Sequence, residues 1–187
     1  IDHLTNDFEY IQNVYAWYGM WSGNYKRFGY KVGLRGELSD ISWMQHNTGA
    51  SDQLDKYGNL FPSLFSSYNI SDADELQFSA IRRITRPRGM RLNPTPNMSD
   101  STTITYGNPD LHSEEAFSGE MNFLHTTSNG HVYTMSAYYK FTDDVTEQYS
   151  WTEMVDDKVI MKSTYANLNR SHSTGLELIA KNKFKAL

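Results

Sequence analysis

The sequence contains no cysteine, so neither a disulfide framework nor thiolate chemistry is available to it. It lacks any run of the roughly 18 apolar residues that a transmembrane helix needs, although the strands of a membrane barrel need no such run. A formal net charge of −5 argues against wholesale binding to nucleic acid. Helical periodicity is also scarce, which favours an all-β protein.

Aromatic residues are abundant for so polar a chain, with 13 tyrosines, nine phenylalanines and four tryptophans among 187 residues. Aromatic side chains favour β-strands. Tyrosine and tryptophan also favour the interface between a membrane and water. The composition therefore fits both a soluble β-sheet domain and a membrane β-barrel.

Residues 30–38, YKVGLRGEL, alternate between apolar and ionic positions. The apolar positions are Tyr30, Val32, Leu34 and Leu38, and the charged positions are Lys31, Arg35 and Glu37. Because residues two apart share a face of a strand, one face is apolar and the other charged. A soluble sheet would bury the apolar face in a protein core, whereas a membrane barrel would turn it toward lipid.

Similar period-two segments recur along the chain and predict an antiparallel up-and-down meander of about eight strands. We place these strands at about 7–19, 27–43, 57–70, 75–87, 113–126, 131–143, 158–168 and 174–186. Short connections are expected at 20–26, 71–74, 127–130 and 169–173, and long ones at 44–56, 88–112 and 144–157. This alternation is typical of outer-membrane barrels, which have short turns at one end and long loops at the other.

The segment from 76 to 115 carries a combination of motifs that resembles one family of proteins. The matching residues are Ser79, Arg82, Arg83, Arg86 and Pro87, then Leu92, Asn93 and Pro94, then Gly107, Asn108, Pro109, Leu111 and Glu114. In this combination the sequence resembles the barrel of TonB-dependent outer-membrane receptors, especially the branch called the outer membrane β-barrel family. The resemblance covers about residues 7–184, with Ser113 standing where the family usually has proline.

The resemblance implies that residues 1–187 form part of a larger transmembrane β-barrel in the bacterial outer membrane. It also implies a receptor that imports a scarce nutrient of unknown identity. The partners expected for the full-length protein are outer-membrane lipid, a plug domain and the TonB system. The sequence itself shows no plug, no TonB box and no terminal barrel strand, and we expect it to be an excised piece of a longer protein.

The same interpretation assigns roles to individual residues. Lys31, Arg35, Glu37 and Arg83 are candidates for the face toward the lumen, because they oppose the apolar positions of their strands. Pro87 cannot donate to a strand ladder and should end its strand at the rim. The motif expected in an extracellular loop comprises Arg86, Pro87, Asn93, Pro94, Gly107, Asn108 and Pro109.

The arginines between 82 and 91 have two interpretations. They could bind anionic ligands or lipopolysaccharide phosphates, or they could pair with acidic residues of loops and plug. We favour the second interpretation, because charge at a barrel rim is commonly paired.

Neither a metal site nor a catalytic centre is predicted, and no cofactor is expected. No two of the six histidines have zinc-ligand spacing within one element, although His125 and His131 could meet across a hairpin. The acidic stretch around Glu114 and Glu120 has no partnered nucleophile. The alternatives to a receptor are a soluble eight-stranded ligand-binding barrel and a non-transporting surface protein built on an outer-membrane barrel.

Overall fold

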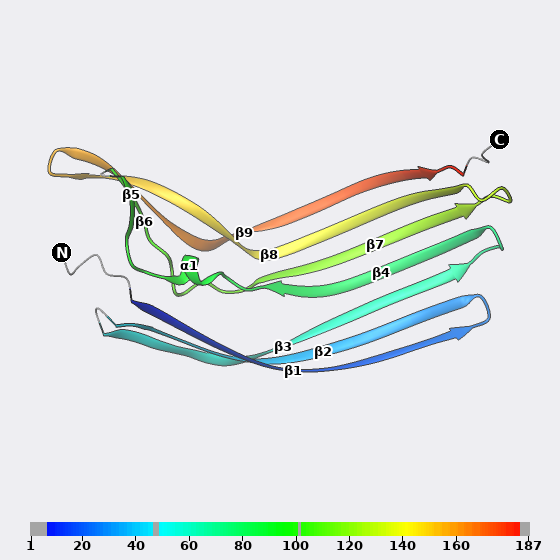
Figure 1. Ribbon diagram of the computed structural model, residues 1–187, viewed down its shortest axis with the longest axis horizontal. Helices are drawn as coiled ribbons and strands as arrows, with labels where there is room; N and C mark the ends of the chain where they lie inside the picture. The colour runs from blue at the N-terminus through cyan, green and yellow to red at the C-terminus, as the bar shows by residue number, and fades with distance from the viewer. Residues whose placement is uncertain (1–6, 47–48, 101, 184–187) are drawn as a thin grey trace.

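The computed structural model describes residues 7–46, 49–100 and 102–183, with side chains for all of these except 52–55, 99 and 100. They form one nine-stranded sheet in the order β1-β2-β3-β4-β7-β8-β9-β6-β5 (Figure 1). The elements are β1 (Phe8–Tyr25), β2 (Phe28–Gln45), β3 (Ala50–Asn69), β4 (Asp74–Thr85), α1 (Gly89–Leu92), β5 (Asn97–Asp100), β6 (Thr103–Thr105), β7 (Glu114–Thr126), β8 (Val132–Val155) and β9 (Lys158–Lys181).

The predicted fold class is confirmed, because the long strands pair antiparallel with their neighbours in sequence. The meander has seven long strands rather than eight, and two short strands, β5 and β6, lie in the connection between β4 and β7. Parallel pairing is limited to three residues of β6 against β9. Within the described residues, no helix is long and apolar enough to cross a membrane.

Several predicted connections are wrong in position or length. Strand β8 continues to Val155 and β9 is unbroken, so most of the loop predicted at 144–157 and all of the turn predicted at 169–173 are strand. The chain instead reverses at Asp156 and Asp157, which have left-handed φ values of 49° and 60°. Polar residues mislead here because those of 144–155 and 169–173 lie within paired strands rather than in turns.

Two other connections are shorter than the sequence suggests. The turn predicted at 20–26 is confined to Lys26 and Arg27, with Lys26 at a φ of 56°. The long loop predicted at 44–56 is mostly strand, since β2 ends at Gln45 and β3 begins at Ala50. Only the connection predicted at 88–112 is long, and there the prediction is confirmed.

The register aligns the apolar positions of all seven long strands on one face of the sheet. Val32, for example, lies opposite Trp21 of β1 and Leu64 of β3. The face that we call the apolar face includes Trp17, Trp21, Val32, Leu34, Leu64, Phe78, Met121, Phe123, Met135, Tyr139, Leu176 and Leu178. Many of these side chains have no protein cover, and Leu178 is 78% exposed.

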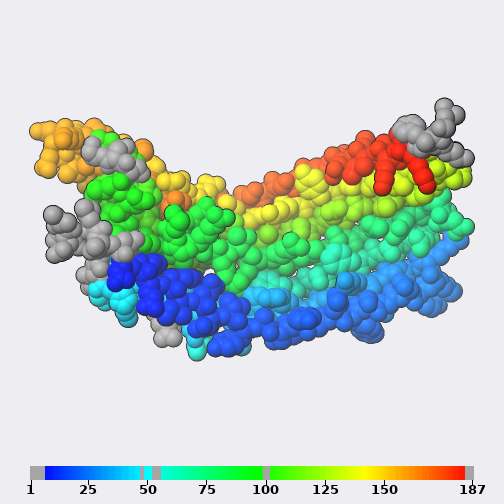
Figure 2. All heavy atoms as spheres, in the orientation of Figure 1, coloured from blue at the N-terminus to red at the C-terminus, as the bar shows by residue number. Residues whose placement is uncertain are grey.

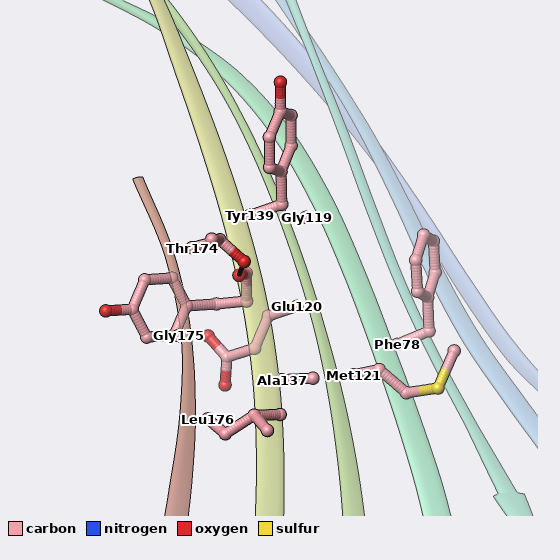
Figure 3. Close-up of a pocket in the computed structure, with 10 residues that line it drawn as sticks. Phe78, Gly119, Glu120, Met121, Ala137, Tyr139, Thr174, Gly175 and Leu176 are labelled. Carbon is pink, nitrogen blue, oxygen red and sulfur yellow. Dashed lines mark hydrogen bonds between the residues drawn. The ribbon is translucent and has the colours of Figure 1, made fainter. Parts of the chain in front are cut away.

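The opposite face, which we call the polar face, carries the alternate residues of the same strands. Its members include Lys31, Arg35, Glu37, Phe61, Ser63, Gln77, Arg83, Glu120, Asn122, Lys140 and Glu177. The four residues predicted to share the lumen-facing side therefore do lie on one face. Consecutive residues Glu120 and Met121 leave β7 in opposite directions (Figure 3).

The sheet divides toward the end opposite the short turns. Strands β3 and β4 pair only from Ser63–Ile81 to Asn69–Glu75, although both strands continue beyond Ser63 and Ile81. Beyond that point, toward the left of the view, strands β1–β3 and the far end of the β8–β9 hairpin diverge. The connection between β4 and β7 lies between them (Figure 1). The space-filling view shows this connection, in green, filling the gap (Figure 2).

Candidate functional site

The candidate site is the connecting segment, residues 86–100 and 102–113, with the strand ends that it touches. It leaves the sheet after Thr85 and rejoins it at Glu114. The three buried hydrophobic side chains of the described residues are gathered here: Ile41, Leu92 and Leu111, each no more than 6% exposed. Elsewhere the sheet has almost no buried core, so the segment forms the one compact region of the structure.

Two of the predicted loop motifs meet each other through their backbones. The amide of Gly107 donates to the carbonyl of Asn93 (2.9 Å), and the amide of Asn108 donates to that of Arg91 (2.6 Å). A Cβ at position 107 would collide with the Asn93 backbone and lie 2.8 Å from the Arg91 carbonyl oxygen. Glycine is required at this position because the two halves of the segment touch there.

The two asparagines that precede prolines act as local turn formers. The Asn93 Oδ1 accepts a hydrogen bond from the Thr95 amide (3.0 Å), and the Asn108 Oδ1 accepts one from the Asp110 amide (2.9 Å). Both are Asx turns, which reverse the chain without a strand ladder. Asn108 also donates through Nδ2 to the carbonyl of Tyr165 on β9 (2.9 Å), so it joins the segment to the sheet.

On its β2–β3 side the segment covers the polar face with apolar residues. Leu92 and Leu111 line a cavity of about 430 Å³ together with Ile41, Tyr10 and Tyr57. Burial raises the pKa of Tyr10, and the neighbouring Tyr57 adds to the effect. On its β1–β3 side the cavity is therefore lined by phenol and aliphatic groups.

Arg86 connects the start of the segment to β2. Its guanidinium donates to Glu37, which is only 7% exposed, and to the Ser39 hydroxyl (3.1 Å). Arg35 Nε holds the other carboxylate oxygen of Glu37 at 2.7 Å. Burial opposes the charge on Arg86, but its hydrogen bonds to Glu37 and Tyr57 outweigh burial and raise the Arg86 pKa. The carboxylate thus accepts from two arginines, which fixes the segment to the sheet.

On its other side the segment is held by β8 and β9. Asn167 accepts from the His112 amide (2.9 Å) and donates to the Asp144 carbonyl (2.6 Å). The amide of Tyr106 donates to the Ser163 carbonyl (2.9 Å), next to the parallel pairing of β6 with β9. The sequence gives no sign of the role of Asn167, because it lies within a polar stretch of strand.

The lumen-facing candidates do not form a single cluster. Arg35 contacts Glu37 directly, and Arg83 lines the same recess as both. Lys31 lies nearer the short turns, where it lines a separate recess with Glu75 and Glu120. The polar face is therefore richer in arginine near the connecting segment and richer in glutamate near the turns.

Arg82 lies on the apolar face, as its strand position predicts. It donates to the Leu60 carbonyl (2.6 Å) and to Glu115 (2.7 Å), and its guanidinium lies 5.6 Å from the centre of the Phe117 ring. Two further ion pairs, Lys56–Asp40 and Arg170–Asp143, also lie where the apolar face ends. Arg82 and Arg86 do pair with acidic residues, but these partners lie on strands β7 and β2 and not in a loop, so the predicted pairing is correct in kind and wrong in location.

A shallow groove of about 630 Å³ crosses β4, β7, β8 and β9 (Figure 3). It forms where small residues, Gly119, Ala137 and Gly175, lie between larger ones such as Phe78 and Leu176. Its lining draws on both faces of the sheet.

The described residues contain no group of three or more side chains that could hold a metal ion. His3 lies outside the described residues. The contact that His125 and His131 could have made across the hairpin is not among the interactions of the described residues, in which His125 stacks on Tyr133. Ser71, Asp74 and His125 are hydrogen-bonded, but Asp74 is the central acceptor (2.6 and 2.7 Å), so a nucleophile-to-base contact is not formed.

The family model described as "Outer membrane protein beta-barrel family" matches residues 1–186. Among curated proteins none matches the chain. Solved structures with a similar fold include the hemophore receptor HasR of Serratia marcescens, in complex with its hemophore HasA and heme. That likeness has a TM-score of 0.70 and 18% identity over 90% of this chain and 31% of HasR.

Two further structures share the fold. The siderophore receptor PirA of Pseudomonas aeruginosa has a TM-score of 0.56 and 12% identity over 94% of this chain and 40% of PirA. The copper transporter OprC has a TM-score of 0.59 and 15% identity over 94% of this chain and 27% of OprC. The chain therefore spans about a third of the length of these structures, and by name they are receptors or transporters rather than enzymes.

Proposed function

The chain belongs to the outer membrane protein beta-barrel family, and on this premise we propose that it forms part of a TonB-dependent receptor that imports a scarce nutrient. It is a segment of a β-barrel of the bacterial outer membrane, similar in fold to TonB-dependent receptors. In the proposed full-length protein the partners are a plug domain and the TonB system.

One observation carries the proposal: a single register places the apolar side chains of seven consecutive strands on one face. A soluble sheet would have to cover such a face, yet Leu176 and Leu178 are 76% and 78% exposed. Lipid is the solvent that makes such a face favourable. In the proposal this face meets lipid, and Lys31, Arg35, Glu37 and Arg83 meet the lumen.

The proposed orientation follows from the connections. Three short turns, 26–27, 70–73 and 127–131, lie at one end of the sheet, and the connecting segment lies at the other, together with the two-residue turn of the long β8–β9 hairpin. Outer-membrane barrels place short turns in the periplasm and long connections outside the cell. We therefore assign the connecting segment, with its motif from Arg86 to Pro109, to the extracellular side. The soluble eight-stranded barrel is wrong, because the chain is a segment of an outer-membrane barrel.

The proposal is tested in cells that make the full-length protein. Val32→Cys should resist a water-soluble thiol reagent and should be quenched by a lipid-soluble quencher, whereas Lys31→Cys should react from water. Import is tested separately, by uptake of haem, a ferric siderophore or copper in a strain with and without the gene. Uptake that needs both the gene and TonB supports the receptor, and a barrel with lipid-facing Val32 but no uptake supports the non-transporting surface protein.

A further inference from the structure

The division between β3 and β4 leaves a seam in the wall of the sheet. Beyond Ser63 and Ile81 the two strands no longer pair, and each keeps only its other neighbour, β2 or β7. Arginine side chains span the seam instead of a backbone ladder. Arg82 reaches the Leu60 carbonyl at 2.6 Å, and Arg86 reaches past β3 to Glu37 of β2.

A recess of about 340 Å³ opens at this seam, mainly on the polar face. Arg35, Glu37, Phe61, Arg82, Arg83 and Arg86 all line it. Four of these six side chains are arginines, drawn from two strands and the start of the connecting segment. Guanidinium groups are the side chains best suited to bind carboxylate or phosphate, because their fork of donors matches two oxygens of the anion.

The recess has more positive charge than its protein partners neutralise. Its four arginines carry four positive charges, and Glu37 and Glu115 are the two carboxylates that pair with them, so two positive charges remain. Arg83 is exposed on the polar face, and the described residues offer it no ion pair or hydrogen bond. The excess charge is therefore accessible from the polar face rather than hidden in the wall.

The arginines that do have partners also keep donors unused. The Nε atoms of Arg82 and Arg86 are both buried, and neither has an acceptor among the described residues. A buried donor without an acceptor is costly, and native proteins seldom keep one without a reason. Both arginines line the recess in which Arg83 and Arg35 would hold an anionic group.

We propose that this recess binds a carboxylate or phosphate group of a ligand in the barrel lumen, with Arg83 as the residue that makes first contact. The inference rests on the proposed import function and narrows its nutrient to an anionic compound. Arg35 supplies a second guanidinium while it remains paired with Glu37 (2.7 Å). Phe61 offers an apolar surface beside the charges, which suits a ligand that carries an anionic group on a less polar body.

The test uses the purified full-length protein in a non-ionic detergent, so that lipid phosphates are absent. An arginine-specific glyoxal reagent is applied in chloride buffer, with and without citrate or inorganic pyrophosphate, and each modified arginine is located by mass spectrometry. We expect Arg83 to react in chloride and to be protected several-fold by at least one of the two anions. Arg170, which lies outside the recess and pairs with Asp143, is the matched control and should react equally in all buffers.

A second measurement follows binding directly. Calorimetric titration of the more protective anion should show at least tenfold weaker binding to Arg83→Gln than to the wild type, with partial retention in Arg83→Lys. Protection of Arg83 no greater than that of Arg170 would overturn the inference. The inference would also be overturned if Arg83 did not react with the reagent in any buffer, because a group of the full-length protein would then occupy the recess. Uptake assays separate this inference from import: uptake without anion binding contradicts only the recess.

Discussion

Two parts of this chain are stabilised by different solvents. We call the wall residues 15–38, 58–85, 114–142 and 171–181, and the rim residues 8–14, 39–46, 49–57, 86–100, 102–113 and 143–170. In the wall, large apolar side chains such as Trp21 and Leu178 are 73% and 78% exposed. In the rim, Leu92 is 3% exposed. The buried hydrophobic side chains of the described residues, Ile41, Leu92 and Leu111, all lie in the rim, while the proposed function assigns the exposed apolar side chains of the wall to lipid.

Polar groups differ between the two parts in the same way. In the rim, the backbone of the irregular connecting segment is held by individual hydrogen bonds, which involve Gly107, Asn108 and Asn167. The wall satisfies its backbone through regular ladders, except at the seam, where Arg82 replaces the ladder. The irregular backbone of the connecting segment therefore lies at the end that we assign to the extracellular side, outside the part of the sheet assigned to the bilayer, as the physics of a bilayer requires.

Removing a buried side chain from the rim should have the largest effect of the changes considered. Leu92→Ala should destabilise the rim by about 2–5 kcal/mol, because a cavity remains where protein surrounds the side chain. Leu178→Ala in the wall should lower the free energy of unfolding by only about 1–2 kcal/mol, the transfer free energy of the removed carbon atoms. No cavity adds to this loss, because lipid can fill the space.

Limited proteolysis of the connecting segment and denaturant unfolding in lipid vesicles, both on the full-length protein, measure the two costs. Faster cleavage of the segment in Leu92→Ala, with the barrel still folded, is the expected result. Equal losses in the two variants would mean that the wall is packed against protein as the rim is.

The second prediction places a charge on the apolar face of the wall. Val32→Arg should cost about 2–4 kcal/mol if position 32 lies near the middle of the bilayer. Lys31→Arg, one residue away on the polar face, is the matched control and should change the stability little. The temperature at which the full-length barrel unfolds in a gel-shift assay measures the stability of both variants. An unfolding temperature of Val32→Arg equal to that of the wild type would contradict contact of Val32 with lipid.

The third prediction compares two glycines. Gly107→Ala should cost about 1–3 kcal/mol through overpacking, because the added Cβ meets backbone atoms that cannot move aside independently. Gly19→Ala in the wall has no atom within 4 Å of its added Cβ and should stay within about 0.5 kcal/mol of the wild type.

Proteolysis of the connecting segment again provides the measurement for the glycine pair. Cleavage should accelerate in Gly107→Ala and should be unchanged in Gly19→Ala. Unchanged cleavage in Gly107→Ala would show that Asn93 and Gly107 do not pack backbone to backbone.

The wall was accessible to prediction from sequence and the rim largely was not. The alternation of Lys31 with Val32 is a local pattern imposed by the strand itself, so it predicts both strand and face. The same pattern predicts that Arg83 lies on the polar face and Arg82 on the apolar face, and the register confirms both. Local periodicity suffices here because each residue meets only its neighbours in a ladder.

The rim depends on contacts between residues far apart in sequence. The residues around Asn167 in the sequence do not indicate that its side chain accepts a hydrogen bond from the His112 amide. Those around Glu37 do not indicate that Arg86 donates to its carboxylate. The loop and turn predicted at 144–157 and 169–173 failed because turn-forming residues such as Asn169 and Ser171 also occur within paired strands. The motif residues from Arg86 to Pro109 were identified by resemblance, but their pairing needed the structure.

The smallest expected effect concerns the short-turn end of the wall, where a hydrogen-bond network is exposed rather than buried. Asp74 accepts from the Ser71 hydroxyl (2.6 Å) and from His125 (2.7 Å), and these hydrogen bonds, that of Ser71 first, lower the Asp74 pKa. A lowered pKa means that folding favours the ionised carboxylate. Its stabilisation is present above the ordinary aspartate pKa of about 3.9 and is lost as the pH falls through the lower folded value.

Asp74→Asn should therefore unfold at a slightly lower temperature than the wild type at pH 7, with the difference closing in strong acid. Leu92→Ala, which removes no titrating group, should show the same deficit at both pH values, and an Asp74→Asn deficit that did not change with pH would contradict the role of the charge.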